Sequence, residues 1–249
     1  MRRLTLPPRP DWQAKAEKIG FIWHSADATY WDESAAYAFT LREVEDDIEV
    51  AAGELHQMCL ALVEDAIEDE RLLARLAIPR EHWDFVANSW RAGHPSFYGR
   101  FDFGYDGSAP PKLYEYNADT PTSVFEAATF QWLWLEDQLA AGVLPAGTDQ
   151  FNTLFEDLRG RFQAIFPDGG FVHFASDAKA EEDRQTVKFF EDLAIQAGLE
   201  TTFVAVQDIG LDADGRFVDL QGYVLQAAFK LYPWENMLRE PFAARLARA

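Results

Sequence analysis

A strand–helix–strand pattern in the last third of the chain constrains the fold more than any other feature of the sequence. Residues 171–175 form a short apolar run, residues 181–197 have the spacing of an amphipathic helix, and residues 201–206 form a second apolar run. A unit of this kind places two strands parallel to each other, because its helix crosses over between them. The sequence therefore predicts a mixed α/β fold.

A second pattern lies in the middle of the chain, where aromatic and polar residues alternate on both sides of a turn. Residues 99–105 and 112–117 are the two alternating runs, and a Gly/Pro-rich turn at 106–111 separates them. Such a pattern is typical of a β-hairpin. Strict alternation predicts one buried aromatic face, made of Phe101, Phe103, Tyr114 and Tyr116.

Most of the remaining chain is predicted to be helical, because apolar residues recur every three to five positions. The predicted helices cover residues 25–67 (one long helix or two), 69–76, 80–90, 120–138, 150–166 and 240–249. In the fourth of these, Thr120 suits the N-cap and Pro121 suits the first helical position. Residues 222–226 suit a further strand. The predicted parts of a single domain are a helical region 1–98, a hairpin and helix at 99–145, and an α/β region at 146–249.

Charge and composition argue against several classes of function. The chain has 22 Lys and Arg against 42 Asp and Glu, a formal net charge of −20, which argues against a nucleic-acid or anionic-membrane partner. No apolar stretch approaches the roughly 20 residues that a membrane span needs, and the start of the chain lacks the apolar core of a secretory signal. The single cysteine, Cys59, allows no intrachain disulfide. We therefore expect a cytoplasmic protein.

The hairpin carries the first candidate site. Arg100 and Asp102 share one face of the first strand, and Glu115 and Asn117 share one face of the second. If the strands pair in a suitable register, a cation, two carboxylates and an amide converge. Carboxylate and amide oxygens suit Mg²⁺, and an arginine can bind phosphate through two hydrogen bonds. The helix that follows offers free N–H groups to an anion. The alternative is an ordinary exposed hairpin face with a surface ion pair.

A second candidate follows the strand at 171–175. Glu181, Glu182 and Asp183 begin the next helix, and ligands in open α/β sheets bind at the carboxyl ends of parallel strands. Acidic side chains there could hold a polyamine. The alternative is a negatively charged first helical turn that the helix dipole stabilises.

Several sequence segments resemble the glutathionylspermidine synthase family. The hairpin segments carry the resemblance most specifically: GRFDFGYDG at 99–107 and LYEYNADTPTS at 113–123. It is supported by YWDESA at 30–35, ELHQMC at 54–59 and QWLWLE at 131–136. The likeness runs along nearly the whole chain and is greatest to the stand-alone, synthetase-like members, which have no amidase domain.

The resemblance implies an ATP-grasp fold and a ligase that joins a carboxylate to an amine through an acylphosphate. The implied cofactors are ATP and Mg²⁺, with two ions, and the implied partners are a small peptide or carboxylate donor and an amine or polyamine acceptor. The family extends more than a hundred residues further, with its nucleotide-cradling lysines and lid there. The chain thus resembles the N-terminal part of the family fold.

The resemblance also implies roles for individual residues. Asp102, Glu115 and Asn117 fall at the metal-ligand positions, and Arg100 falls where an arginine meets the γ-phosphate and the developing acylphosphate. Arg100 and Asp102 are therefore the implied ATP-binding residues. The positions that match the substrate site are Thr120, Thr122, Glu181, Glu182 and Asn236. Both threonines stand where the synthetases carry serines, and the asparagine stands where they carry a threonine.

Two other functions remain open from the sequence. One is a non-catalytic module that keeps the Mg²⁺, nucleotide or peptide site without turnover. The other is an acidic scaffold domain that binds no small ligand. ATP-dependent phosphate release separates the ligase from both, and Mg²⁺-dependent nucleotide binding separates the two from each other.

Overall fold

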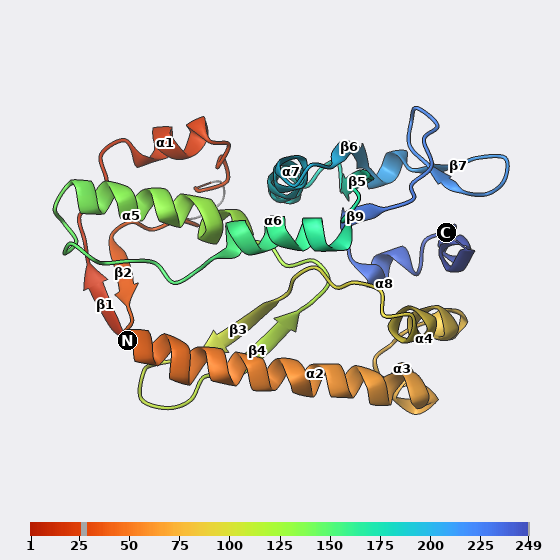
Figure 1. Ribbon diagram of the computed structural model, residues 1–249, viewed down its shortest axis with the longest axis horizontal. Coiled ribbons are helices and arrows are strands. Elements are labelled where there is room, and N and C mark those ends of the chain that lie inside the picture. Colours follow the sequence, from red (N-terminus) through yellow and green to blue (C-terminus); the bar gives the residue numbers. More distant parts are fainter. Residues whose placement is uncertain (26–28, 249) are drawn as a thin grey trace.

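The structure is a computed structural model that describes residues 1–25 and 29–248. Its α-helices are α1 (Trp12–Lys18), α2 (Val50–Glu68), α3 (Glu70–Arg75), α4 (Trp83–Arg91), α5 (Gln131–Ala140), α6 (Leu154–Ile165), α7 (Glu181–Gln196) and α8 (Trp234–Met237). Its strands are β1 (Arg2–Thr5), β2 (Ala35–Ala38), β3 (Arg100–Gly104), β4 (Lys112–Asn117), β5 (Phe171–Ser176), β6 (Glu200–Ala205), β7 (Gly210–Leu211), β8 (Phe217–Val218) and β9 (Ala228–Leu231). The predicted mixed α/β fold is confirmed (Figure 1).

The strand–helix–strand unit forms as predicted. Strands β5 and β6 pair in parallel through the crossover helix α7, and β9 adds a second parallel strand on the other side of β5. The main core lies where α6 and α7 cover this sheet, and Phe174, Phe190 and Leu193 are fully buried there. The third strand was not expected at β9. The predicted strand at 222–226 is reduced to a single bridge between Val224 and Val218.

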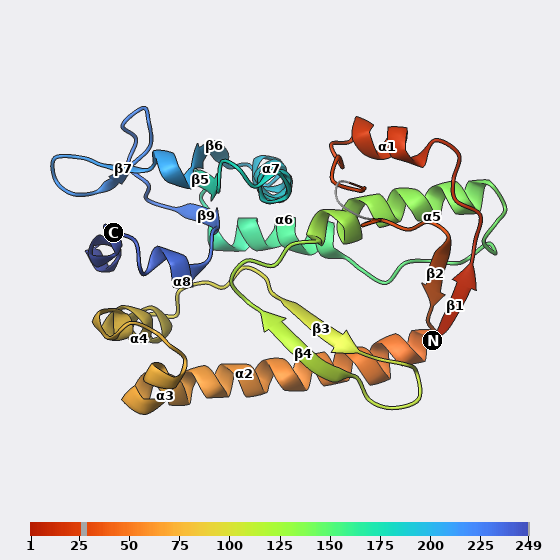
Figure 2. The same cartoon turned by 180° about the vertical axis from the view of Figure 1, so that it is seen from behind.

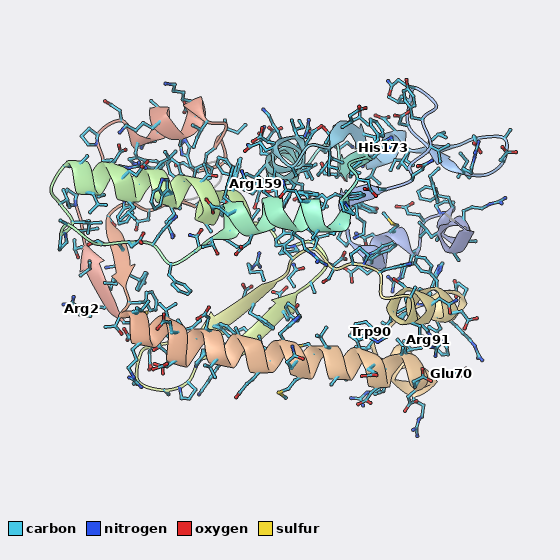
Figure 3. All side chains as sticks on the ribbon, in the orientation of Figure 1. Arg2, Glu70, Trp90, Arg91, Arg159 and His173 are labelled. Carbon is cyan, nitrogen blue, oxygen red and sulfur yellow. The ribbon has the colours of Figure 1, made fainter. Side chains whose placement is uncertain are left out.

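The other face of the same sheet carries a buried polar pair. His173 on β5 is fully buried, as expected for a residue in an apolar strand, and it lies in the densely packed region of Figure 3. Its Nε2 lies 3.3 Å from Oδ2 of Asp219. The Oδ1 atom of Asp219 accepts the backbone N–H groups of Gln221 and Tyr223. This pair therefore connects the loop after β8 to the sheet.

The predicted hairpin is confirmed and lies along the long helix α2 (Figures 1 and 2). Two hydrogen bonds join the hairpin segment to this helical region. The Nδ1 atom of His56 lies 3.1 Å from the hydroxyl of Tyr116, and the hydroxyl of Tyr105 donates to Asp47 at 2.9 Å. These contacts fix the aromatic face of the hairpin against the helix, so that its polar face is left free.

The prediction of the buried aromatic face is wrong for one residue, Tyr114. Tyr114 is 79% exposed, whereas Phe101 stacks on Tyr116 with ring centroids 4.0 Å apart. The register shifts after Asp102, so that Phe103 pairs with Leu113 instead of Tyr114. A β-bulge of this kind interrupts the alternation of faces, which the sequence pattern alone did not indicate.

The prediction of a helix over residues 25–67 is wrong in its first half. Residues 35–38 form β2, which pairs antiparallel with β1 at the start of the chain. The helix begins only after Thr40, whose hydroxyl accepts the N–H of Glu43 while the Glu43 carboxylate accepts the N–H of Thr40. This reciprocal capping starts the π-helical turn η1 (Glu43–Glu49), which runs on into α2. Residues 26–28 of the predicted helix lie outside the described residues.

The helix predicted from Thr120 starts later than expected. It begins at Val124 and continues through the π-helical turn η3 (Glu126–Phe130) into α5. Ser123 just before it has a φ of 67°, in the left-handed region. Thr120 caps no helix, because the helix begins four residues later, and its N–H is bound by the Asn117 side chain.

The other predicted helices are mostly confirmed. The segment predicted at 69–76 forms α3, and the segment at 80–90 forms the 3₁₀ turn η2 (Arg80–His82) followed by α4. The segment predicted at 150–166 forms α6. The C-terminal segment forms a 3₁₀ helix, η5 (Ala243–Arg248), and Ala249 lies outside the described residues. None of the helices in the described part of the chain combines the length and apolar character needed to span a membrane.

A second core joins the N-terminal segment to α5. Phe21 and Phe130 are fully buried at its centre. Arg9 forms an ion pair with Glu33 at 2.6 Å, and the two side chains are 4% and 0% exposed. The same guanidinium reaches Asp137 on α5 at 2.8 Å. The region 1–98 thus contains a small sheet and a buried ion pair as well as its helices.

Candidate functional site

The strand register brings four polar residues to one face of the hairpin. Arg100 pairs directly with Asn117, and Asp102 pairs directly with Glu115. Directly opposed residues of an antiparallel pair point to the same side of the sheet. The predicted convergence of one guanidinium, two carboxylates and one amide is therefore confirmed as geometry.

Arg100 and Asp102 form the strongest contact on this face. The Nε and Nη2 atoms of Arg100 donate to the two carboxylate oxygens of Asp102 at 2.7 and 3.0 Å. These bonds lower the pKa of Asp102 below its usual value and raise the pKa of Arg100. The Nη1 atom of Arg100 reaches the backbone carbonyl of Thr122 at 3.3 Å, which ties the hairpin to the segment before the next helix.

Asn117 ends the second strand and shapes the turn that follows. Its Oδ1 atom accepts the backbone N–H groups of Asp119 at 3.2 Å and Thr120 at 3.0 Å. The side chains of Arg100 and Asn117 thus hold Thr120 and Thr122 beside the hairpin face. These two threonines are the only predicted substrate residues that a hydrogen bond links to this face within the described residues.

The face fits Mg²⁺ by the chemistry of its donors. Two carboxylates lie on one side together with the amide oxygen of Asn117, which would have to exchange a backbone N–H for the metal. Glu115 is exposed, with no hydrogen bond from any described residue. Mg²⁺ typically takes one or two carboxylates and completes its shell with water and substrate phosphates. No group of three or more His, Cys, Asp or Glu side chains with metal-binding geometry lies within residues 1–25 and 29–248. A metal here would therefore have to share its shell with water or phosphate.

The predicted acidic pair lies at the start of α7. Glu181 accepts a hydrogen bond from Gln185 at 2.8 Å, within the same helix. Glu182 lies beside Asp183, and burial, followed by the charges of Glu182 and Asp177, raises the pKa of Asp183. No ion pair or hydrogen bond between described residues joins these glutamates to the hairpin face.

Asn236 is exposed on the short helix α8, the first turn after β9. The first residue of this helix, Trp234, donates its backbone N–H to Asp119 at 2.7 Å. The hairpin exit and the helix that carries Asn236 are therefore in direct contact.

Two features of this region were missed from the sequence. One is Lys230 on β9, which pairs with Asp119; a single lysine in the apolar run of β9 was the available signal. The other is Glu126, which is buried and accepts hydrogen bonds from Trp23 at 2.9 Å and Tyr30 at 2.8 Å. A glutamate inside an otherwise apolar helical stretch could have indicated it.

Comparison with known proteins identifies the family. The sequence model described as glutathionylspermidine synthase preATP-grasp matches residues 3–249. A protein of Haemophilus influenzae that carries the name "Putative acid–amine ligase" is 38% identical over 260 aligned positions, which cover 100% of this chain and 64% of that protein.

More distant relatives carry the name of the same family or of another synthetase. The bifunctional glutathionylspermidine synthetase/amidase of Escherichia coli is 29% identical over 90% of this chain and 36% of its own length. The trypanothione synthetase of Crithidia fasciculata is 28% identical over 78% of this chain and 30% of its own length. The chain thus spans about a quarter to two thirds of the length of the curated relatives that it matches. It belongs to the glutathionylspermidine synthase preATP-grasp family.

Proposed function

We propose that the protein carrying this domain is an ATP- and Mg²⁺-dependent ligase that joins a carboxylate to an amine. One observation supports this most: the hairpin register places Arg100, Asp102, Glu115 and Asn117 on one face. The names of the relatives, which include an acid–amine ligase and a glutathionylspermidine synthetase, agree with such a reaction. The proposal includes an ATP-grasp fold for the whole protein and a cytoplasmic location.

The proposed roles follow from the chemistry of each side chain. Asp102, Glu115 and Asn117 would hold Mg²⁺, as one ion or two, through their oxygen atoms. The ions would neutralise charge on the transferring phosphoryl group. The guanidinium of Arg100 would release Asp102 and bind phosphate oxygens. Its planar geometry suits two parallel hydrogen bonds to phosphate.

The proposed reaction has two steps. A carboxylate oxygen attacks the γ-phosphorus of ATP, ADP leaves, and an acylphosphate forms. The amine then attacks the acyl carbon, inorganic phosphate leaves, and the amine nitrogen loses a proton. Arg100 stabilises both steps electrostatically, because negative charge grows on the oxygens that it faces.

The substrate side, which is the binding site for the carboxylate donor and the amine acceptor, is proposed to lie next to the polar face of the hairpin. The residues proposed to contact the carboxylate donor and the amine acceptor are Thr120, Thr122, Glu181, Glu182 and Asn236. The threonine hydroxyls and the asparagine amide can hydrogen-bond a peptide, and the glutamates can attract a cationic amine. Glutathione and spermidine are the first donor and acceptor to test, because a relative is named for their product.

Isotope transfer tests the proposal. The protein carrying this domain is incubated with ATP, Mg²⁺, a carboxylate donor labelled with ¹⁸O and an amine. Passage through an acylphosphate moves one ¹⁸O atom into the released phosphate, and release requires the donor. Phosphate release without ¹⁸O would contradict the acylphosphate, and nucleotide binding without release would contradict the ligase.

A non-catalytic module that binds metal and nucleotide is the second candidate. It is favoured by the fact that the guanidinium of Arg100 is bonded to both oxygens of Asp102, so that in this arrangement it does not face a transferring phosphoryl group. In that case Mg²⁺ and nucleotide would bind to the hairpin face, and no phosphate would be released with any donor.

A further inference from the structure

A single carboxylate joins the hairpin exit to two elements far along the chain. Asp119 lies two residues beyond the end of β4. Its Oδ1 atom accepts from the ammonium of Lys230, 111 positions later, and its Oδ2 atom accepts the backbone N–H of Trp234 at 2.7 Å. The carboxylate thus contacts both β9 and the first residue of α8.

Lys230 is held in place from several sides. Its side chain is 14% exposed, and besides Asp119 its Nζ atom donates to the backbone carbonyl of Tyr232 at 2.9 Å. The same ammonium lies over the ring of Trp234, 4.6 Å from the centroid. Separating an ion pair that is partly buried leaves an uncompensated charge, so the two side chains hold each other in one geometry.

The other end of the connection is the hairpin face. The backbone N–H of Asp119 is bound by the side chain of Asn117, which also binds the N–H of Thr120. Asn117 in turn pairs with Arg100 across the hairpin. A continuous series of hydrogen bonds therefore runs from the proposed metal and phosphate face to the helix that carries Asn236.

We propose that Asp119 and Lys230 are positioning residues, which hold the Asn117–Thr120 turn and α8 in one fixed arrangement. The inference rests on the proposed function, because it gives the pair a role in setting the metal and phosphate face against the substrate side. Neither side chain touches metal or substrate in this role. They act through Asn117 and Trp234.

Amide hydrogen exchange tests the connection in the chain itself. Lys230→Gln is expected to speed the exchange of the Thr120 and Trp234 amides by about tenfold. The Trp234 amide is bonded to the Asp119 carboxylate, which loses its partner, and the Thr120 amide lies in the Asn117–Thr120 turn that contains Asp119. Lys188→Gln, which removes an exposed lysine from α7, should change neither amide. Unchanged rates at both amides in Lys230→Gln would overturn the proposal.

Loss of protection in β5 and β6 as well would mean that Lys230→Gln unfolds the chain more widely. The milder Asp119→Asn variant then decides, because it removes the charge and keeps the size. It should speed exchange at Thr120 and Trp234 alone, and wild-type rates at both would overturn the proposal.

Binding of Mn²⁺, used as a paramagnetic substitute for Mg²⁺, separates positioning from mere structural support. Lys230→Gln is expected to weaken Mn²⁺ binding several-fold, and Lys230→Arg, which keeps the charge, should restore it. Equal affinity in all three proteins would overturn the positioning role. If the wild-type chain binds no Mn²⁺, the proposed metal site fails, while the exchange rates still decide whether the pair connects the turn to α8.

Discussion

Replacing Arg100 with glutamine is expected to strengthen the binding of a divalent cation when no nucleotide is present. In the structure, both oxygens of Asp102 are bonded to the guanidinium. A cation at Asp102 and Glu115 must therefore displace Arg100 first. The substitution removes this competition, and it should also weaken the binding of a nucleotide, which loses its phosphate contact.

The size of the effect follows from the exposure of the pair. The side chains of Arg100 and Asp102 are 34% and 38% exposed, so solvent screens their attraction. An ion pair of this exposure contributes up to about 1 kcal/mol, which corresponds to about a fivefold change in affinity. The Kd for Mn²⁺ is thus expected to fall by about fivefold in Arg100→Gln.

The assay is titration of the chain with Mn²⁺ followed by electron paramagnetic resonance of the free ion. Arg71→Gln is the matched control, because Arg71 holds Asp69 in the same two-pronged manner and at the same spacing in the sequence, outside the hairpin. Both substitutions remove one positive charge. Equal or weaker Mn²⁺ binding in Arg100→Gln than in Arg71→Gln would show that Arg100 does not compete with a cation for Asp102.

Three further predictions concern other parts of the chain. Glu115→Gln should weaken Mn²⁺ binding by about tenfold or more and leave the urea midpoint unchanged, because the side chain is exposed; a lowered midpoint would contradict this. Arg9→Met should lower the free energy of unfolding in urea by about 3–5 kcal/mol, because Glu33 is left buried without its partner, whereas a loss below about 1 kcal/mol would indicate a pair no stronger than a surface one. Burial of its hydroxyl raises the pKa of Tyr30 to about 12, so the phenolate absorbance that Tyr30→Phe removes should appear near pH 12 and not near 10. Because the folded state keeps this proton after the unfolded state has lost it, the stability due to Tyr30 should fall as pH rises from 10 to 12.

Local sequence patterns predicted the parts of the fold that local rules control. The parallel pair of β5 and β6 and the hairpin both formed, because alternation and periodicity report directly on which side of an element is buried. The polar face followed for the same reason, since residues two apart in a strand share a side. Its role in binding metal and phosphate stays a prediction.

The elements that were missed depend on contacts between distant segments. Residues 35–38 are rich in alanine, which favours a helix, yet pairing with the first residues of the chain makes them a strand. The bulge that exposes Tyr114 has no sequence signature of its own here. The helix after Thr120 starts late, following a turn that the Asn117 side chain holds. The pairing of Asp119 with Lys230 spans 111 positions.

The most direct test of the account locates the cation on the chain. The net charge of −20 gives a cation many weak alternatives on the surface, so the position of binding matters more than its occurrence. Substoichiometric Mn²⁺ with a non-hydrolysable ATP analogue is added to the ¹⁵N-labelled protein, and the loss of amide signals is followed by NMR. We expect the signals of Asp102, Glu115 and Asn117 to disappear first. Earlier loss at Glu181 and Glu182, or uniform loss over the acidic surface, would contradict it.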